Sequence, residues 1–371
     1  MKARTPDAAP VKLSCRDVWK VYRGEAAPYF DKDVSSESAG ELARRMRADG
    51  AIPAVVDVSF DVHVGEIFVI MGLSGSGKST VVRCLSRLVE PNHGEVRLDG
   101  EDLLTKSSKE LIDIRRHKMG MVFQNFGLLP HLNVFDNIGF PLSLQGLPAP
   151  ERNERVSRVI QLVGLEGRET SFPRQLSGGQ QQRVGIARSL AVEPELWFLD
   201  EPFSALDPLI RRQMQDEFLR IQQRLKKSIV FITHDFLEAL RIADRMMIMR
   251  DGMVVQVGAP ADLILNPADE YVAEFTEDVP MVRVLKASDV LDPSRTEKPG
   301  MPQRDAETTV EDLLPLLASH PEGISMMRDG ASIGVVTDAS VIAALAHDTH
   351  DGSGADSPES KRRRNGEATQ S

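Results

Sequence analysis

Hydrophobic and polar residues alternate in two stretches near the start of the chain, residues 11–22 and 55–64. A period of two predicts strands with one covered face, which is typical of an antiparallel sheet. The insertion between them, residues 25–51, has Ser38 and Glu41 at capping-box spacing, ahead of apolar positions at helical spacing. We therefore expect a short amphipathic surface helix in this insertion.

Four short, continuously apolar runs follow a different pattern. Such runs predict strands that are buried on both faces of a parallel sheet. Polar residues come at the end of each run or just after it, where open α/β sheets bind ligands. The runs are residues 67–71, 196–199, 229–232 and 246–249. Between about residues 130 and 175, amphipathic spacing predicts a helical subdomain that interrupts this sheet.

The carboxyl-terminal part of the chain has a third pattern. Residues 293–304 are polar and contain Pro and Gly, which predicts a linker over residues 280–307. Residues 308–347 predict a small α+β module of a helix, two short strands and a second helix. Residues 348–371 have the composition of a disordered tail, and their basic cluster at 361–364 favours a solvated surface over a lipid or nucleic-acid contact.

Length and composition narrow the class of protein. The chain has 371 residues, more than one core of ~250–300 residues holds, so a large domain over residues 11–279 and a smaller module are expected. The net charge of −10 disfavours a broad nucleic-acid surface. Cys15 and Cys84, without CxxC spacing, predict free thiols. We expect a soluble chain, because no apolar run approaches the ~18–20 residues of a membrane span and no signal-peptide core is apparent.

A glycine-rich loop directly follows the first apolar run, at residues 72–79, and fits the pattern G-x-x-x-x-G-K-[ST]. Glycines let successive backbone N–H groups converge on phosphate oxygens, and the helix that follows adds the positive end of its dipole. Lys78 is expected to reach the β- and γ-phosphates, while Ser79 and Thr80 face Mg²⁺ and the α-phosphate. The flanking strand and helix disfavour a chance glycine turn. The other loop residues expected at phosphate are Gly72, Leu73, Ser74, Gly75, Ser76 and Gly77.

Polar residues after the other strands predict the chemistry of the site. Asp200 and Glu201 end the second run, where a P-loop NTPase places a carboxylate that holds Mg²⁺ through water and a general base. His234 follows the third run and is placed to contact the γ-phosphate. Gln124 follows a strand-like stretch and can offer its amide oxygen to Mg²⁺ or to the attacking water. Each residue alone would be an ordinary loop or helix-start residue, but the phosphate loop upstream favours the catalytic interpretation.

The pentapeptide at residues 176–180, Leu-Ser-Gly-Gly-Gln, precedes a helical stretch and places backbone N–H groups at a helix N-terminus. It is therefore a second phosphate-binding device. If the helical subdomain projects outward, one chain cannot bring both devices to the same γ-phosphate, whereas two chains paired head to tail can. Because this chain contains one cassette, we expect the partner to be an identical copy.

The order of these motifs resembles that of the ATP-binding cassette (ABC) ATPases over residues 11–275. The resemblance implies an α/β P-loop NTPase (RecA-like) core with an antiparallel β subdomain and a helical subdomain, which binds ATP with Mg²⁺. It implies that Asp207 lies in the loop that joins two shared sites, and that Gln124 lies near the membrane subunit. It also implies that the partner's ATP is contacted by Ser177, Gly178, Gly179 and Gln180.

Residues 66–71, 203–211 and 255–258, together with the insertion, resemble more narrowly the ATPase subunits of ProV-type quaternary-amine importers. This resemblance implies import of glycine betaine, proline betaine or choline-like solutes. It implies membrane permease subunits and a periplasmic or extracellular substrate-binding protein as partners, with the ATPase peripheral on the cytoplasmic face of the membrane. Another small polar cargo, such as an amino acid, stays open.

The same resemblance bears on the two ends of the chain. In this family an aromatic residue of the first strand stacks on adenine; Tyr22 is the best match, and Tyr29 and Phe30 are alternatives. Near the other end, residues 310–345 resemble a single cystathionine-β-synthase (CBS) module. CBS modules bind ligands as pairs, so this one either pairs across the dimer or is a non-regulatory remnant.

Two other classes are weighed against a transport ATPase. Soluble ABC proteins that act on DNA carry long heptad runs before the pentapeptide, and those that act on ribosomes carry two cassettes; this sequence has neither feature. A P-loop kinase or GTPase outside the ABC family would have no use for the pentapeptide at residues 176–180.

Overall fold

In the computed structural model of the chain, the described residues are 9–30, 37–123, 127–204 and 206–347. They form two compact units, which divide between Glu277 and Asp278. Each unit has a hydrophobic core of its own.

The amino-terminal unit contains two sheets. Within the described residues the first sheet has the order β2-β1-β4-β5, and all its neighbours pair antiparallel. The two alternating stretches therefore form the expected sheet, although β2 begins at Ile52 rather than Val55. The strands are β1 (Val11–Tyr22), β2 (Ile52–His63), β4 (His93–Leu98) and β5 (Glu101–Asp102).

The second sheet has the order β10-β9-β3-β8-β7-β6 and is parallel apart from the β9–β10 hairpin. Every residue of β3, β7 and β8 is buried, which confirms the strands expected from the apolar runs. Phe60 of β2 stacks on Phe68 of β3 with ring centroids 4.9 Å apart, so the two sheets share one core. The strands are β3 (Ile67–Met71), β6 (Met119–Val122), β7 (Leu196–Asp200), β8 (Ser228–Ile232), β9 (Arg245–Arg250) and β10 (Met253–Gly258).

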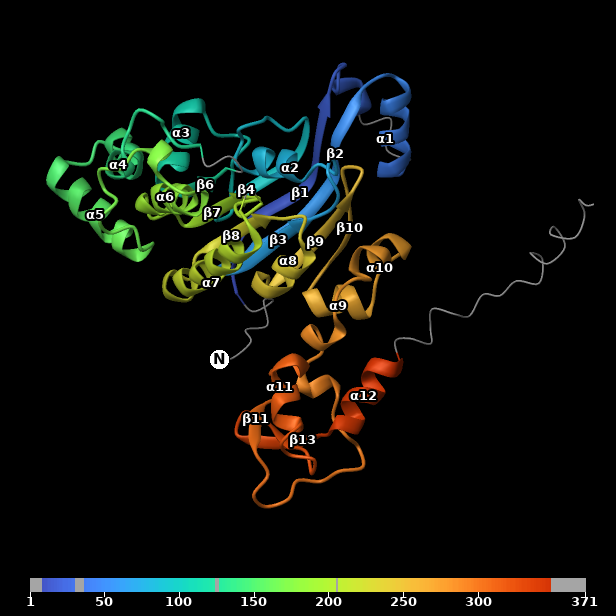
Figure 1. The fold of residues 1–371 in the computed structure, drawn as a ribbon. Coiled ribbons are helices and arrows are strands. Elements are labelled where there is room, and N and C mark those ends of the chain that lie inside the picture. Colours follow the sequence, from blue (N-terminus) through green and yellow to red (C-terminus); the bar gives the residue numbers. More distant parts are fainter. Residues whose placement is uncertain (1–8, 31–36, 124–126, 205, 348–371) are drawn as a thin grey trace, which may run out of the picture. The chain divides into compact units, whose positions relative to one another are not determined.

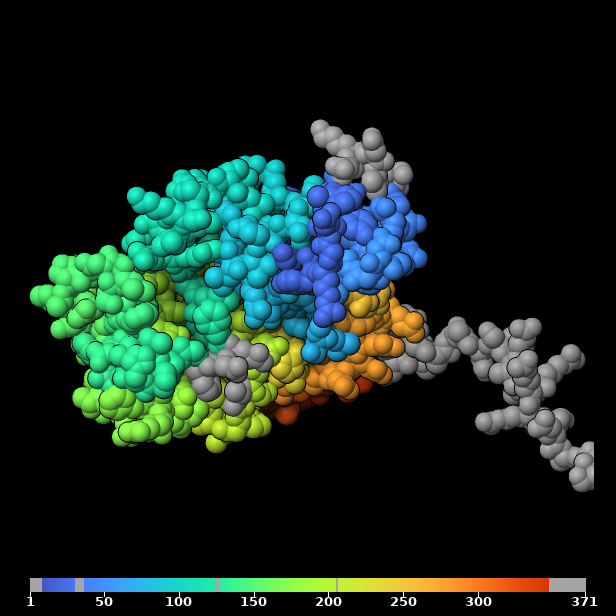
Figure 2. All heavy atoms as spheres, turned by 90° about the horizontal axis from the view of Figure 1, so that it is seen from above, coloured from blue at the N-terminus to red at the C-terminus, as the bar shows by residue number. Residues whose placement is uncertain are grey.

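Three helices, α4, α5 and α6, pack on one another in a helical subdomain; α4 and α5 lie within the expected residues 130–175, and α6 follows them. They lie at the end of this unit opposite α1 (Figure 1, Figure 2). The buried side chain of Asn137 fixes the preceding loop, because its amide donates to the carbonyls of Leu129 and Leu132. The helices of the unit are α1 (Ala39–Ala48), α2 (Lys78–Leu85), α3 (Ser108–His117), α4 (Val134–Leu144), α5 (Ala149–Leu162), α6 (Gly178–Ala191), α7 (Pro208–Leu225), α8 (Phe236–Ile242), α9 (Pro260–Leu265) and α10 (Glu270–Thr276).

The expected helix of the insertion is α1, and its capping box is formed as the sequence indicates. The Ser38 hydroxyl accepts from the Glu41 N–H, and the Glu41 carboxylate accepts from the Ser38 N–H. The apolar face of the helix buries Ala43 and Met46 in a small cluster with Trp19 of β1. The insertion thus packs on the antiparallel sheet.

The carboxyl-terminal unit has a three-stranded sheet of order β11-β12-β13 among its described residues. The helix, strand pair and second helix expected for residues 308–347 are all present. The structure differs from the expected linker over 280–307, because Leu285 and Val290 lie in the core of this unit and β11 pairs parallel with β12. The elements are β11 (Gln303–Asp305), α11 (Val310–Leu317), β12 (Ile324–Arg328), β13 (Ala331–Val336) and α12 (Asp338–His347).

Three further expectations concern the whole chain. Cys15 and Cys84 are buried free thiols, as expected. Across the part of the chain that the structure describes, no helix combines the length and the apolar character needed to span a bilayer. The tail at 348–371 lies outside the described residues.

Candidate functional site

The glycine-rich loop connects β3 to α2, which begins at Lys78. Two of its glycines are required by the backbone. Gly77 has φ +99°, and a Cβ there would lie 2.3 Å from the carbonyl oxygen of Ala54. Gly72 has φ +146°, and a Cβ there would lie 2.2 Å from the carbonyl oxygen of Met249. Side chains at either position would collide with backbone, so the loop closely follows its neighbouring strands.

Lys78 is buried, and its ammonium is turned toward the loop. Nζ donates to the carbonyl oxygens of Gly72 and Leu73, each at 2.8 Å. Burial lowers the pKa of Lys78, while the carboxylates of Glu201 and Asp200 oppose that shift. Both acceptors are uncharged, and an anionic phosphate oxygen is a stronger partner for an ammonium group. The position therefore favours a bound phosphate.

Asp200, the last residue of β7, meets the start of α2 directly. The Ser79 hydroxyl donates to Asp200 Oδ1 at 3.1 Å. Burial raises the pKa of Asp200, and the neighbouring Glu201 carboxylate raises it further. A hydroxyl and a carboxylate oxygen side by side suit Mg²⁺, which takes few protein ligands and completes its octahedron with waters and phosphates. The donor set fits the expected cation.

Glu201 and His234 come together at the same edge of the sheet. His234 Nδ1 lies 3.3 Å from Glu201 Oε1. The Glu201 backbone is left-handed, with φ +45°, and its N–H donates to the carbonyl oxygen of Ile232 at the end of β8. A non-glycine residue in this conformation stores strain that the surrounding structure must hold. The turn thereby aims the carboxylate of Glu201 at the histidine.

The pentapeptide forms the start of α6. Ser177 is the N-cap, and its capping box pairs the Ser177 hydroxyl with the Gln180 N–H and the Gln180 side chain with the Ser177 N–H. A Cβ on Gly179 would lie 2.7 Å from Ile210 Cγ2, so the glycine lets α6 approach the start of α7 closely. The helix N-terminus expected from the sequence is confirmed, and it begins at Gly178, before the expected Gln181.

Asp207 caps α7, since its Oδ1 accepts from the Ile210 N–H at 3.1 Å. The structure does not test the expected roles of Gln124 and Asp207. Gln124 lies outside the described residues, so its position carries no argument here. The role of Asp207 between two shared sites stays a prediction.

Tyr22 ends β1 and is 38% exposed, and the Lys20 ammonium lies 5.2 Å from the centroid of its ring. Tyr22 pairs with Ile52 of β2, two residues before Ala54, whose carbonyl borders the phosphate loop. Tyr22 is therefore the last residue of a strand whose partner strand, β2, borders the phosphate loop.

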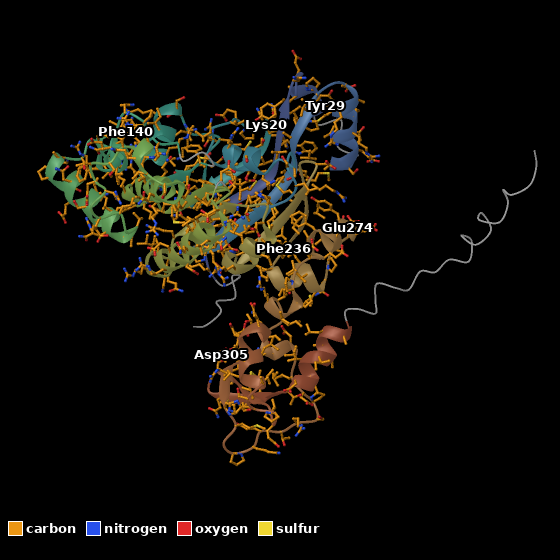
Figure 3. All side chains as sticks on the ribbon, viewed as in Figure 1. Lys20, Tyr29, Phe140, Phe236, Glu274 and Asp305 are labelled. Atoms are coloured by element: carbon orange, nitrogen blue, oxygen red, sulfur yellow. The ribbon has the colours of Figure 1, made fainter. Side chains whose placement is uncertain are left out.

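The two alternative aromatic residues are engaged within the insertion and its surroundings. The Tyr29 hydroxyl donates to Asp49 at 2.6 Å, and Phe30 stacks on His93 with ring centroids 4.8 Å apart. Figure 3 shows Tyr29 and Lys20 at the same end of the unit. These contacts favour Tyr22 as the residue left for a stacked base.

Arg211 of α7 is a residue that the sequence did not single out for a role. Its guanidinium donates to the carbonyl oxygens of Phe203, Ser204 and Leu206 at 3.3, 3.4 and 3.1 Å. It also lies 3.5 Å from Asp235, the neighbour of His234. Arg211 thus ties the loop after Glu201 to the segment that carries the histidine. Its partners are mainly backbone oxygens, which leave no sequence signal.

The phosphate loop, Asp200, Glu201 and His234 meet at one edge of a parallel sheet, and a capped glycine pair begins α6. This geometry defines a P-loop ATPase of the cassette type. A family model described as "ABC transporter" matches residues 55–204.

Curated relatives give the same result over most of the chain. The trimethylamine N-oxide transport system ATP-binding protein TmoW of Pelagibacter ubique is 55% identical over 77% of this chain and 82% of its own. TmoW of Ruegeria pomeroyi is 53% identical over 86% and 93%. The glycine betaine/proline betaine transport system ATP-binding protein ProV of Salmonella typhimurium is 43% identical over 91% and 83%.

A solved structure extends the comparison to the fold. The dimeric post-hydrolysis state of the ATP-binding cassette MJ0796, bound to ADP and Pi, aligns with a TM-score of 0.56 and 31% identity over 67% of this chain and 98% of that one. The chain belongs to the ATP-binding proteins of ABC transporters. The expected fold class and ATPase activity are thereby confirmed, and ATP is the nucleotide of the site.

Proposed function

We propose that this chain is the ATP-hydrolysing subunit of an importer for small methylated amines, and that two identical copies close around ATP to drive transport. The observation that carries the chemistry is the meeting of Ser79 with Asp200 and of Glu201 with His234 at one sheet edge.

The phosphate loop holds the triphosphate. Lys78 moves its ammonium from the loop carbonyls to the β- and γ-phosphates, and Thr80 contacts the α-phosphate. Ser79, Asp200 and Gln124 would hold Mg²⁺, which when bound neutralises phosphate charge as the γ-phosphoryl group leaves. Phosphate oxygens are further contacted by Gly72, Leu73, Ser74, Gly75, Ser76 and Gly77.

Glu201 is the general base, and His234 positions the γ-phosphate. Glu201 polarises a water molecule and accepts its proton as the water attacks the γ-phosphorus. The bond from the γ-phosphorus to the bridging oxygen breaks, and ADP and phosphate are released. The 3.3 Å contact between Glu201 and His234 supports this pairing of roles.

The second half of each site comes from the partner copy. The N–H groups at the start of α6 suit a γ-phosphate, because a helix N-terminus favours anions. ATP then binds the closed dimer more tightly than the open one, which is the differential affinity that a conformational cycle needs. The dimeric cassettes among the similar solved structures support this arrangement. The partner-facing residues are Ser177, Gly178, Gly179, Gln180 and Asp207.

The dimer docks beneath membrane permease subunits on the cytoplasmic face of the membrane, and an extracytoplasmic binding protein delivers the cargo. Tyr22 stacks on the adenine base. In the second unit, which begins at Asp278, residues 308–347 belong to a single CBS-like module, separate from the cassette.

The names of the relatives support the cargo class. Two relatives, both more than 50% identical to this chain, are named TmoW and belong to trimethylamine N-oxide transport systems. The relatives named ProV and OpuAA are named for glycine betaine transport. Both solutes carry a nitrogen with three methyl groups. We therefore add trimethylamine N-oxide to the quaternary amines inferred from the sequence.

The test is reconstitution in proteoliposomes with the permease and binding protein encoded beside this chain. ATP-dependent uptake of trimethylamine N-oxide or glycine betaine, abolished by Glu201→Gln, is the expected result. Uptake of an amino acid but of neither methylated amine would overturn the proposed cargo. Neighbouring genes that encode no permease and no binding protein would overturn the transport role.

A further inference from the structure

The insertion at residues 25–51 is joined to the turn between β9 and β10. Arg47, on the last turn of α1, donates from Nη2 to the carbonyl oxygen of Asp251 at 2.9 Å. Met253, just after the turn, packs against the cluster that holds α1. The insertion therefore contacts the turn on both sides of its tip.

The same turn is bonded to the phosphate loop. The Gly252 N–H donates to the carbonyl oxygen of Ser76 at 3.1 Å, and the Gly252 carbonyl accepts from the Val56 N–H at 2.9 Å. Gly252 Cα lies 3.4 Å from the place where a Cβ of Gly77 would stand. Asp251 and Gly252 both have positive φ, +53° and +88°, so the turn has a defined left-handed shape.

These contacts form a continuous series from α1 to the loop. Arg47 fixes the carbonyl of Asp251, the next residue supplies the N–H that holds Ser76, and Ser76 stands directly before Gly77 and Lys78. Tyr29 of the insertion lies at the end of the unit opposite Phe140 of α4 (Figure 3), so this support reaches the loop from the side away from the helical subdomain.

We propose that the insertion holds the phosphate loop in the conformation that binds nucleotide, with Arg47 as a positioning residue that acts through Asp251 and Gly252. The inference rests on the nucleotide site proposed above. The loop binds phosphate through backbone N–H groups that must converge, so a loop that is already ordered binds ATP more tightly than one that orders on binding. A merely structural insertion would support Trp19 and its cluster without changing nucleotide affinity.

The test uses the full chain and its Arg47→Ala and Arg47→Lys variants. Arg44→Ala is the matched control, because Arg44 is exposed on the same helix and its guanidinium bonds to Gly40 within that helix. The readouts are the ATP dissociation constant by calorimetry, KM and kcat for ATP hydrolysis, and the melting temperature.

Arg47→Ala should weaken ATP binding and raise KM by about threefold to tenfold, the size of one net hydrogen bond, with kcat within about twofold. Arg47→Lys, which keeps a donor, should fall between Arg47→Ala and the wild type. Arg44→Ala should match the wild type.

An unchanged dissociation constant in Arg47→Ala, or an equal loss in Arg44→Ala, overturns the inference. If the wild-type protein binds no ATP, the proposed function is wrong, whatever the variants do. If the Arg47 variants do not fold, hydrogen exchange on the wild type decides: ATP should slow exchange in residues 248–256, and no change there overturns the inference.

Discussion

At the scale of single residues, the site places charges where burial disfavours them. Burial lowers the pKa of Lys78 and raises that of Asp200, so both groups are shifted toward their neutral forms. Binding a triphosphate with its cation relieves both costs at once. The site is therefore destabilised before nucleotide binds, as functional sites commonly are.

The raised pKa of Asp200 predicts a pH-dependent effect of Asp200→Asn in the nucleotide-free protein. Because the pKa is higher in the folded state than in the unfolded state, folding is penalised when the carboxyl is ionised, at pH values above the folded-state pKa. The penalty disappears as the pH falls below the unfolded-state pKa. Asp200→Asn should therefore raise the melting temperature at pH 8, and this gain should shrink as the pH falls toward the unfolded-state pKa of the carboxyl. Calorimetry checks this, and a lower melting temperature at pH 8 would refute it.

Arg211 predicts a loss of catalytic rate without a loss of binding. Arg211→Ala releases the loop after Glu201 from the segment of His234, and misplacing a catalytic group typically costs rate. We expect kcat to fall at least about tenfold, with KM changed less than about threefold. Arg212→Ala is the control, because Arg212 is the exposed neighbour on the same helix. Steady-state kinetics measure kcat and KM, and a wild-type kcat in Arg211→Ala would show that Arg211 does not position the catalytic residues.

The residues of the phosphate loop could be predicted because they are consecutive in the sequence and their spacing is itself the signal. Asp200 and His234 could be predicted because Asp200 ends one visibly buried strand and His234 comes just after another. Arg211 and Arg47 could not be predicted, since their partners are backbone carbonyls brought close by the fold.

At the scale of elements, the phosphate loop itself allows a matched pair of substitutions. Gly75 and Gly77 both have positive φ, but a Cβ on Gly75 meets nothing within 4 Å, whereas one on Gly77 meets the Ala54 carbonyl. Gly75→Ala should cost about 1–2 kcal/mol of unfolding free energy, from backbone strain alone. Gly77→Ala should cost more and abolish ATP binding. Urea unfolding measures the loss of stability in each variant, and calorimetry measures its ATP binding. Equal losses in Gly75→Ala and Gly77→Ala would show that the close contact of Gly77 with β2 does not matter.

The strands and helices with clear periodicity could be predicted, and α1 was predictable from its capping box. The segment at 280–307 could not, because it is mostly polar. It packs into the core through a few apolar side chains, such as Leu285 and Val290, and β11 pairs with a strand about twenty residues further along the chain. Neither feature leaves a periodic pattern.

At the scale of the whole molecule, the two compact units predict that the cassette works alone. A chain that ends at Glu277 keeps the full core of the first unit and all the site residues. Its ATP affinity and hydrolysis should stay close to those of the full chain. Calorimetry and a phosphate-release assay measure this, and complete loss of nucleotide binding would overturn the division into domains.

The most direct measurement is the mass of the Glu201→Gln variant by size-exclusion chromatography with light scattering, with and without Mg-ATP. Without the general base, ATP should persist and hold two copies together, giving dimers with ATP and monomers without it. Adding Gly178→Asp, which sets a negative charge at the partner's γ-phosphate, should restore monomers. If Glu201→Gln binds ATP and yet stays monomeric, the nucleotide is not shared between two chains.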